Sequence, residues 1–207
     1  MLSARGLSFR LPSGDRVLFR DVSFAVDAGE AVAIEGPSGV GKTTLLALLA
    51  GLVQPTSGTV TLESVSTPPF AWVLQTLNSL PSRDVLANAC LYGLVDDLPA
   101  PVLRRRATDL LVELGMGDML AVPARQLSGG EQQRMAVARA LASSRPIVLA
   151  DEPTNQLDRV NARQVMRTLF AASHGQRAVV VVTHDHDALP AGTRVLRLTE
   201  HGLRHVA

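Results

Sequence analysis

The chain has 207 residues and a formal net charge of +1, and 46% of its residues are hydrophobic but only 3% aromatic. This length predicts one domain with a subdomain around an aliphatic core, and the balanced charge argues against a nucleic-acid-binding surface. The lone cysteine, Cys90, excludes an internal disulfide, and no apolar run approaches the ~20 residues that span a bilayer. The N-terminal residues also lack the apolar segment of a signal peptide. We therefore expect a cytoplasmic protein, or one that other proteins recruit to a membrane.

The first part of the chain alternates apolar and polar residues as strands do. Residues 2–30 predict two short strands around a turn at Ser13, Gly14 and Asp15. In the second strand, residues 18–26, one side carries Val22, Phe24 and Val26. Residues 31–34 are an apolar run, which predicts a buried strand that leads directly into the next motif.

A glycine-rich loop follows this strand and fits the pattern G-x-x-x-x-G-K-[ST] without a mismatch: Gly36, Pro37, Ser38, Gly39, Val40, Gly41, Lys42 and Thr43. Such a loop turns its backbone N–H groups toward a polyphosphate. Lys42, the only lysine in the chain, would reach the β- and γ-phosphates, and the Thr43 hydroxyl would ligate Mg²⁺. A helix over residues 43–52, ended by Gly51, would place the phosphates at its N-terminus. The loop alone leaves a kinase possible, because GPSGVGK also resembles the phosphate loop of guanylate kinases.

The middle of the chain changes from strands to helices. Residues 59–62 and 71–74 predict short strands, and the second ends at Gln75. Residues 82–114 then have a helical pattern that ends at Gly115, with one apolar face formed by Leu103, Ala107, Leu110, Leu111 and Leu114. We interpret residues 76–134 as a helical insertion in a strand–helix core made of residues 1–75 and 135–207.

The motif LSGGEQQR, residues 127–134, begins another predicted helix, which runs to about Ser143. Ser128 and Glu131 have the spacing of a capping box, so the start of this helix is well specified. Gly129 and Gly130 each cost about 1 kcal/mol relative to alanine in a helix. Their presence makes sense if a group such as a phosphate must approach the backbone closely.

Acidic and histidine side chains follow two predicted core strands. Residues 146–152 form a buried strand that ends in Asp151 and Glu152, and residues 178–182 form another that leads to His184. The carboxyl ends of parallel strands form the ligand-binding edge of an α/β sheet. There Asp151 would hold Mg²⁺ through water, Glu152 would polarise an attacking water, and His184 would contact the γ-phosphate.

The C-terminal region also contains less informative features. Asp158 precedes a predicted helix over residues 161–173, and residues 195–198 predict a last, peripheral strand. His201 and His205 then belong to a tail without an evident role.

Taken in order, GPSGVGKT, Gln75, LSGGEQQR, IVLADEP, the segment 155–158 and THD strongly resemble an ATP-binding cassette (ABC) ATPase over essentially the whole chain. No guanylate kinase would carry LSGGEQQR. The resemblance implies that residues 36–43 with Thr44 bind the triphosphate, that Lys42 and His184 contact the γ-phosphate, and that Glu152 is the general base. It implies that Thr43, Gln75 and Asp151 form the Mg²⁺ site, and that Asp158 lies in a loop crossing to a second subunit. Ser128, Gly129 and Gly130 would contact ATP held by that other subunit, while Leu11 and Val17 complete the predicted ATP-binding set.

The resemblance also implies an architecture and partners. The fold would be a P-loop NTPase (RecA-like) α/β core with a parallel-rich sheet, a small antiparallel β-subdomain and the helical insertion. The chain would bind ATP and Mg²⁺, form a head-to-tail homodimer or pair with another ATPase subunit, and act on membrane-spanning permease subunits from the cytoplasmic side, with no nucleic acid. The subgroup that it most resembles contains the exporters of the lipoprotein-releasing and macrolide-efflux kind, in which residues 78–82 and 85–94 would receive the permease.

Three features depart from the family pattern. Leu11 occupies the position of the usual adenine-stacking aromatic, the segment between Gly58 and Gln75 is short, and Glu131 replaces the commoner glutamine. The alternatives are a non-transport ABC ATPase, acting on ribosomes, DNA or Fe–S assembly, and, more distantly, a nucleotide kinase.

Overall fold

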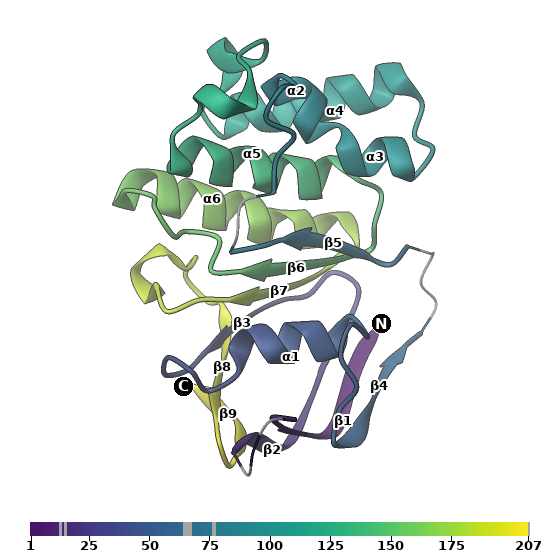
Figure 1. Ribbon diagram of the computed structural model, residues 1–207, viewed down its shortest axis with the longest axis vertical. Helices are drawn as coiled ribbons and strands as arrows, with labels where there is room; N and C mark the ends of the chain where they lie inside the picture. Colours follow the sequence, from purple (N-terminus) through teal and green to yellow (C-terminus); the bar gives the residue numbers. More distant parts are fainter. Residues whose placement is uncertain (13, 15, 64–67, 76–77, 207) are drawn as a thin grey trace.

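The computed structural model describes residues 1–12, 14, 16–63, 68–75 and 78–206, so Ser13 and Asp15 of the predicted turn lie outside the described residues. Within these ranges the strands form two sheets (Figure 1). An antiparallel sheet has the order β2-β1-β4 and consists of β1 (Leu2–Arg10), β2 (Val17–Val26) and β4 (Ser57–Leu62). A larger sheet has the order β5-β6-β7-β3-β8-β9 and consists of β3 (Ala31–Glu35), β5 (Phe70–Val73), β6 (Ile147–Asp151), β7 (Ala178–Val182), β8 (Arg194–Thr199) and β9 (Gly202–Val206).

The larger sheet is parallel from β5 to β8 and is buried on both faces. Strand β6 shows the division: Ile147 and Leu149 belong to one apolar cluster, and Val148 and Ala150 belong to the other. Because both faces are covered, these strands are continuously apolar, which is the pattern that the sequence shows. The predicted α/β class with a parallel-rich sheet and a separate antiparallel sheet is therefore observed.

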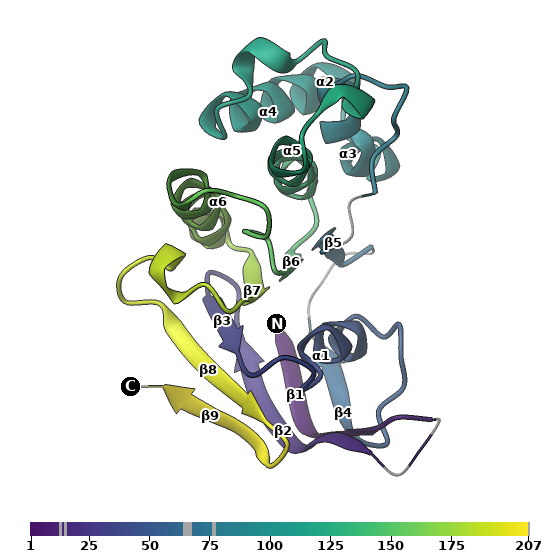
Figure 2. The ribbon, with the colours of Figure 1, turned by 60° about the vertical axis from the view of Figure 1, so that its left-hand side comes forward.

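Helices cover the two faces of the larger sheet unequally. Helix α1 (Lys42–Leu49) packs with the antiparallel sheet on one face, whereas α5 (Gly129–Ala142) and α6 (Arg159–Ala171) lie on the other (Figure 2). Over α5 lies a further helical layer of α2 (Val85–Ala89), α3 (Leu91–Val95) and α4 (Ala100–Glu113). Four short 3₁₀ turns are also described: η1 (Gly117–Met119), η2 (Ala124–Gln126), η3 (Ala172–Gly175) and η4 (His186–Ala188).

The predicted helices are present, with corrected boundaries. Helix α1 ends at Leu49 instead of residue 52, and Gly51 follows with φ +71° as the predicted terminator. The pattern over residues 82–114 is broken into three helices. The break between α2 and α3 falls at Cys90, and the break between α3 and α4 falls where Asp97 has a positive φ and Pro99 cannot continue a helix. The capping box of Ser128 and Glu131 is confirmed at the start of α5.

The prediction for the C-terminal region was wrong in one respect. Strand β8 is not peripheral, because β9 pairs with it in antiparallel fashion and forms the edge of the sheet. His205 lies in β9 and His201 lies in the connecting turn, so these residues are not a tail. Gly202 has φ +122° and ends the tight turn between β8 and β9. A glycine at this position is a sequence signal for a hairpin, which the prediction of a tail did not take into account.

None of the helices in the described part of the chain combines the length and the apolar character needed to cross a bilayer.

We expect Gly58→Ala to destabilise the fold more than Gly51→Ala does. Both glycines have positive φ, +88° and +71° respectively. A methyl group at Gly58 would lie 2.4 Å from the carbonyl of Gly6 in β1, whereas nothing lies within 4 Å at Gly51. The free energy of unfolding, measured by urea denaturation, should fall by about 1 kcal/mol for Gly51→Ala and by at least about 2 kcal/mol for Gly58→Ala. Equal losses would contradict the close approach of β4 to β1.

Candidate active site

A cleft of about 810 Å³ opens at the edge where the strands β3 and β6 end, and it gathers most of the predicted site residues. Because the parallel strands are in register, the ends of β3, β6 and β7 meet at this edge. The predicted residues that line the cleft are Leu11, Gly36, Pro37, Ser38, Gly39, Gly41, Lys42, Thr43, Thr44, Gln75, Asp151, Glu152 and His184. Segments far apart in the sequence thus form one site.

The glycine-rich loop joins β3 to α1 and forms one wall of this cleft. Gly41 is the N-cap of α1 with φ +101°, and a side chain there would press against Leu18 and Phe19 of β2. The Lys42 ammonium folds over the loop and donates to the carbonyl of Gly36 at 2.8 Å. A cation, open backbone N–H groups and a helix N-terminus therefore converge, which is the arrangement that binds phosphate groups.

Asp151 lies beneath Thr43, at the end of β6. Burial raises the pKa of the Asp151 carboxyl, and the Thr43 hydroxyl and the Lys42 charge oppose this rise. Its Oδ1 atom is buried without a hydrogen-bond partner. A buried, unpartnered carboxylate oxygen beside a hydroxyl suits a hard cation such as Mg²⁺. The described residues contain no cluster of three His, Cys, Asp or Glu side chains able to hold a metal, so phosphate and water oxygens would have to supply the other ligands.

Glu152 and His184 are in direct contact across the mouth of the cleft. Glu152 Oε2 lies 2.8 Å from His184 Nδ1 and 3.3 Å from the backbone N–H of His184. Glu152 follows β6 instead of ending it, and its φ of +47° is unfavourable for a non-glycine residue. Its backbone N–H donates to the carbonyl of Val182 at 2.8 Å, which fixes this turn to the end of β7. The structure thus brings together two residues that the sequence placed only at the same edge.

Several predicted site residues do not line the cleft. Val40 points into the apolar cluster around α1, and Val17 lies in β2 without facing the cleft. Asp158 is the N-cap of α6, where its carboxylate accepts hydrogen bonds from two backbone N–H groups. Ser128, Gly129 and Gly130 are also outside the cleft of their own chain.

The two glycines of the LSGGEQQR motif lie against another loop of the same chain. A Cβ atom on Gly129 would stand 1.7 Å from the side-chain oxygen of Gln156, and one on Gly130 would stand 3.0 Å from the Gln156 carbonyl. Because Gly129 and Gly130 have no side chains, Gln156 of the same chain can pack against them. The sequence alone did not predict this contact. The start of α5 and the loop before Asp158 form one surface.

Three residues that line the cleft were missed. Arg16 donates to the carbonyl of Gly39 at 3.0 Å, Leu18 supports Gly41, and Asn155 follows the two acids. The sequence gives little warning of Arg16, because it follows a turn and becomes part of the cleft only when β2 packs beside α1. Asn155 was predictable, since it begins the motif segment 155–158, three residues after Glu152.

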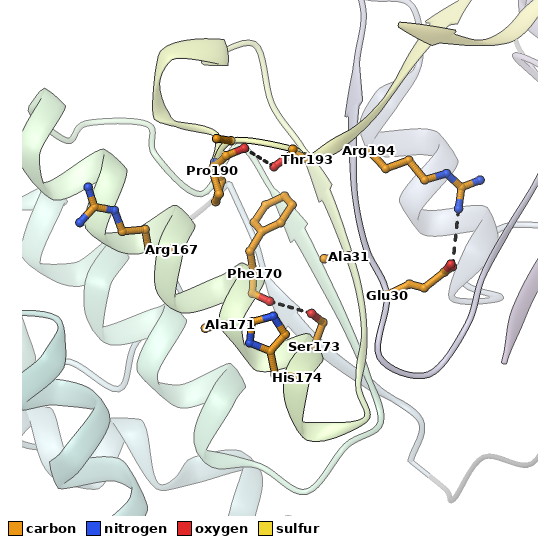
Figure 3. Close-up of a pocket in the computed structure, with 12 residues that line it drawn as sticks. Glu30, Ala31, Arg167, Phe170, Ala171, Ser173, His174, Pro190, Thr193 and Arg194 are labelled. Carbon is orange, nitrogen blue, oxygen red and sulfur yellow. Dashed lines mark hydrogen bonds and ion pairs between the residues drawn. The ribbon is translucent and has the colours of Figure 1, made fainter. Parts of the chain in front are cut away.

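A second hollow lies at the opposite edge of the sheet, between the end of α6 and the start of β8 (Figure 3). Phe170 and Pro190 face its interior, and Arg194 is turned toward Glu30 at 3.6 Å. None of the predicted site residues lines it. We therefore assign the chemistry to the cleft at the carboxyl ends of the strands.

Comparison with known proteins agrees with this geometry. The family model described as "ABC transporter" matches residues 19–155, a range that contains the glycine-rich loop, LSGGEQQR and both acids. The chain belongs to the ABC transporter family. It is an ATPase, binds ATP, and has the P-loop NTPase fold.

Individual relatives support the same assignment. An uncharacterized ABC transporter ATP-binding protein of Thermotoga maritima is 40% identical over 195 residues, which cover 87% of this chain and 83% of that protein. The macrolide export ATP-binding/permease protein MacB of Rhodopseudomonas palustris is 34% identical over 214 residues, but the match covers 96% of this chain and only 33% of MacB. The chain thus spans about a third of the length of that relative.

A solved structure matches this ABC ATPase over its whole length. The ATP-binding cassette MJ0796, in a dimeric post-hydrolysis state bound to ADP and Pi, has a TM-score of 0.85 with 30% sequence identity, and the match covers 100% of this chain and 98% of that one. The predicted family resemblance is confirmed.

We expect Leu11→Tyr to tighten ATP binding. Leu11 lines the cleft beside Arg16 and Leu18, and an aromatic ring there would offer a stacking surface for adenine. Stacking contributes about 1–3 kcal/mol per base, so the dissociation constant measured by calorimetric titration without Mg²⁺ should fall by about tenfold. Leu52→Tyr, at an exposed leucine outside the cleft, is the matched control. An unchanged affinity of the Leu11 variant would show that the base does not bind beside Leu11.

Proposed function

We propose that this ABC ATPase powers a membrane transporter of the exporter type, working as a head-to-tail dimer on membrane-spanning permease subunits. The observation that carries the proposal is the position of Ser128, Gly129 and Gly130. They form the N-terminus of α5, where Ser128 is exposed and the two glycines are half-buried, yet they do not line the cleft of their own chain. A helix N-terminus is an anion-binding element, and a two-fold arrangement lets each chain supply it to the ATP of the other.

Each site residue then has a distinct role. Residues 36–44 hold the phosphates, with Lys42 neutralising their charge, while His184 contacts the γ-phosphate. Glu152 polarises the attacking water. Gln75 follows the end of β5 and lines the cleft, where its side chain can respond to a bound nucleotide. Thr43, Asp151 and Gln75 hold Mg²⁺, which would neutralise charge on the β- and γ-phosphates. Asp158 and Gln156 border the surface that the second chain covers.

The activities named for two similar proteins support a transport role. MacB is an export ATP-binding/permease protein, and the MJ0796 cassette is dimeric. By analogy, we propose that the chain lies on the cytoplasmic face of a membrane through its permease, with no nucleic acid as partner.

We propose that the permease docks on residues 76–134, the helical subdomain. A mainly apolar cleft of about 290 Å³ lies there, and Leu80, Cys90, Leu94 and Leu103 are among the residues that line it. Leu80 and Leu94 remain 45% and 55% exposed, which fits a surface that an amphipathic helix of the permease covers.

A buried arginine connects the segment beside this cleft to α5, the helix that begins within the LSGGEQQR motif. Arg139 of α5 donates to the Asn78 carbonyl at 2.6 Å and also bonds the side-chain oxygen of Asn78. Asn78 stands three residues after Gln75, and Leu80 lies two residues further on. These hydrogen bonds attach α5 to the segment that leads to Leu80 and the proposed docking cleft.

We expect Glu152→Gln to abolish ATP turnover while permitting ATP-driven dimerisation. The amide keeps the shape of the side chain but cannot accept a proton from water. Phosphate release should fall by at least about a hundredfold, and analytical ultracentrifugation with MgATP should show a dimer that persists. Hydrolysis at the parent rate would contradict the assignment of the base.

We expect Ser128→Arg to block hydrolysis but not binding of ATP to the monomer. The bulky cation would obstruct the surface that approaches the second chain, whereas the cleft of the same chain stays unaltered. ATP affinity is measured at protein concentrations at which the chain is monomeric, and turnover at concentrations that favour the dimer. Ser82→Arg, at another exposed serine, is the control and should retain turnover. Loss of monomer binding in the Ser128 variant would contradict action on the second chain.

A further inference from the structure

A buried carboxylate just before the phosphate loop has no role in the site described above. Glu35 is the last residue of β3 and directly precedes Gly36. Its side chain is only 4% exposed, although it carries a charge at the centre of the sheet edge. An ionised carboxylate in such a position is costly unless cations offset its burial.

Two side chains approach this carboxylate from either side of β3. Arg197 stands opposite Glu35 in the register of β3 and β8, and its Nε donates to Glu35 Oε1. On the other side, His186 Nε2 lies 2.7 Å from Glu35 Oε2, which ties the start of η4 to the end of β3.

The contact with His186 has a consequence for the active site. His186 begins the turn η4, two residues after His184, and the segment between them is short. Fixing His186 to the end of β3 therefore restricts where His184 can lie relative to the loop that begins at Gly36. Glu152 contacts His184 from the other side at 2.8 Å.

We propose that Glu35 and His186 are positioning residues, which hold the His184 loop in register with the phosphate loop. The inference rests on the proposed contact of His184 with the γ-phosphate. Neither residue lines the nucleotide cleft, so both act through His184. This contact suits the role because Glu35 and His186 belong to two different elements, and losing either side chain releases the loop without removing a group that touches ATP.

The test compares turnover in matched histidine variants. His186→Ala should lower kcat by about tenfold through misplacement of His184, while the KM for ATP stays within about twofold. His186→Lys places an ammonium group that can contact Glu35 and should recover most of kcat. His201→Ala removes another histidine that contacts a glutamate, the exposed Glu200 at 3.3 Å outside the cleft, and should leave kcat unchanged.

A second comparison addresses the pair itself. Glu35→Gln should lower kcat as His186→Ala does, and the double variant should be no slower than the slower of the two single variants. Thermal melting of each variant identifies those that are folded, and kinetic constants are compared only among these. If Glu35→Gln does not fold, the contrast of His186→Ala with His186→Lys decides the question.

The possible failures are distinguishable. If His184→Ala turns over ATP at the parent rate, the proposed contact of His184 with the γ-phosphate is wrong. If His184→Ala abolishes turnover but His186→Ala keeps the parent kcat, only the positioning role is overturned. Multiplicative losses in the double variant would also overturn it, because Glu35 and His186 would then act independently.

Discussion

The register of the parallel strands is the constraint on which the active site depends. Residues 34, 151 and 182 meet at one sheet edge because β7 pairs in register with β6 along residues 147–151 and with β3 along residues 31–34. A one-residue slip of β6 would turn Asp151 away from Thr43 and place an apolar side chain in the cleft. The apolar residues of β6 and β7, buried on both faces, therefore specify the distance between the loop that holds phosphates and the two acids.

Hydrogen bonds and charge at the sheet edge refine what the strand register sets. Glu152 keeps an unfavourable positive φ because its backbone N–H is bonded to Val182 and its carboxylate to His184. Strain of this kind persists only where surrounding contacts determine the conformation. Here it aims the carboxylate across the cleft instead of along the strand. Without the buried apolar residues of β6 and β7, the strands would no longer hold Glu152 and His184 close enough for these contacts.

The sequence predicted most of the fold because its signals are local. Buried apolar runs, the glycine-rich loop and the capping box of Ser128 each follow from residues close in the chain. Helix boundaries were less accurate, because the helical pattern over residues 82–114 obscured the break at Asp97 and Pro99. Strand β9 was missed because its exposed side chains, such as those of Arg204 and His205, mask the weak alternation of an edge strand.

For the site, sequence reasoning was strongest where motif and strand end coincide, as at Lys42 and Asp151. It was weakest where a contact joins distant segments. Arg16 has no distinctive sequence context, yet it borders the nucleotide cleft. Gln156 lies in the motif segment 155–158, but that motif did not predict its contact with Gly129. Such contacts arise only after the sheets and helices have packed, so residue type and spacing cannot specify them.

The close packing of Gln156 against Gly129 bears on how the two halves of a composite site would move. The start of α5 and the loop leading to Asp158 touch, so a displacement of one is transmitted to the other by contact. Near the C-terminal end of α5, Arg139 bonds both the backbone and the side chain of Asn78, which joins α5 to the segment that leads into the helical layer. One helix therefore contacts the loop before Asp158 at its start and this segment near its end. Under the proposed function, a permease that shifts the helical layer would move α5 and, through Gly129, the loop that contains Gln156.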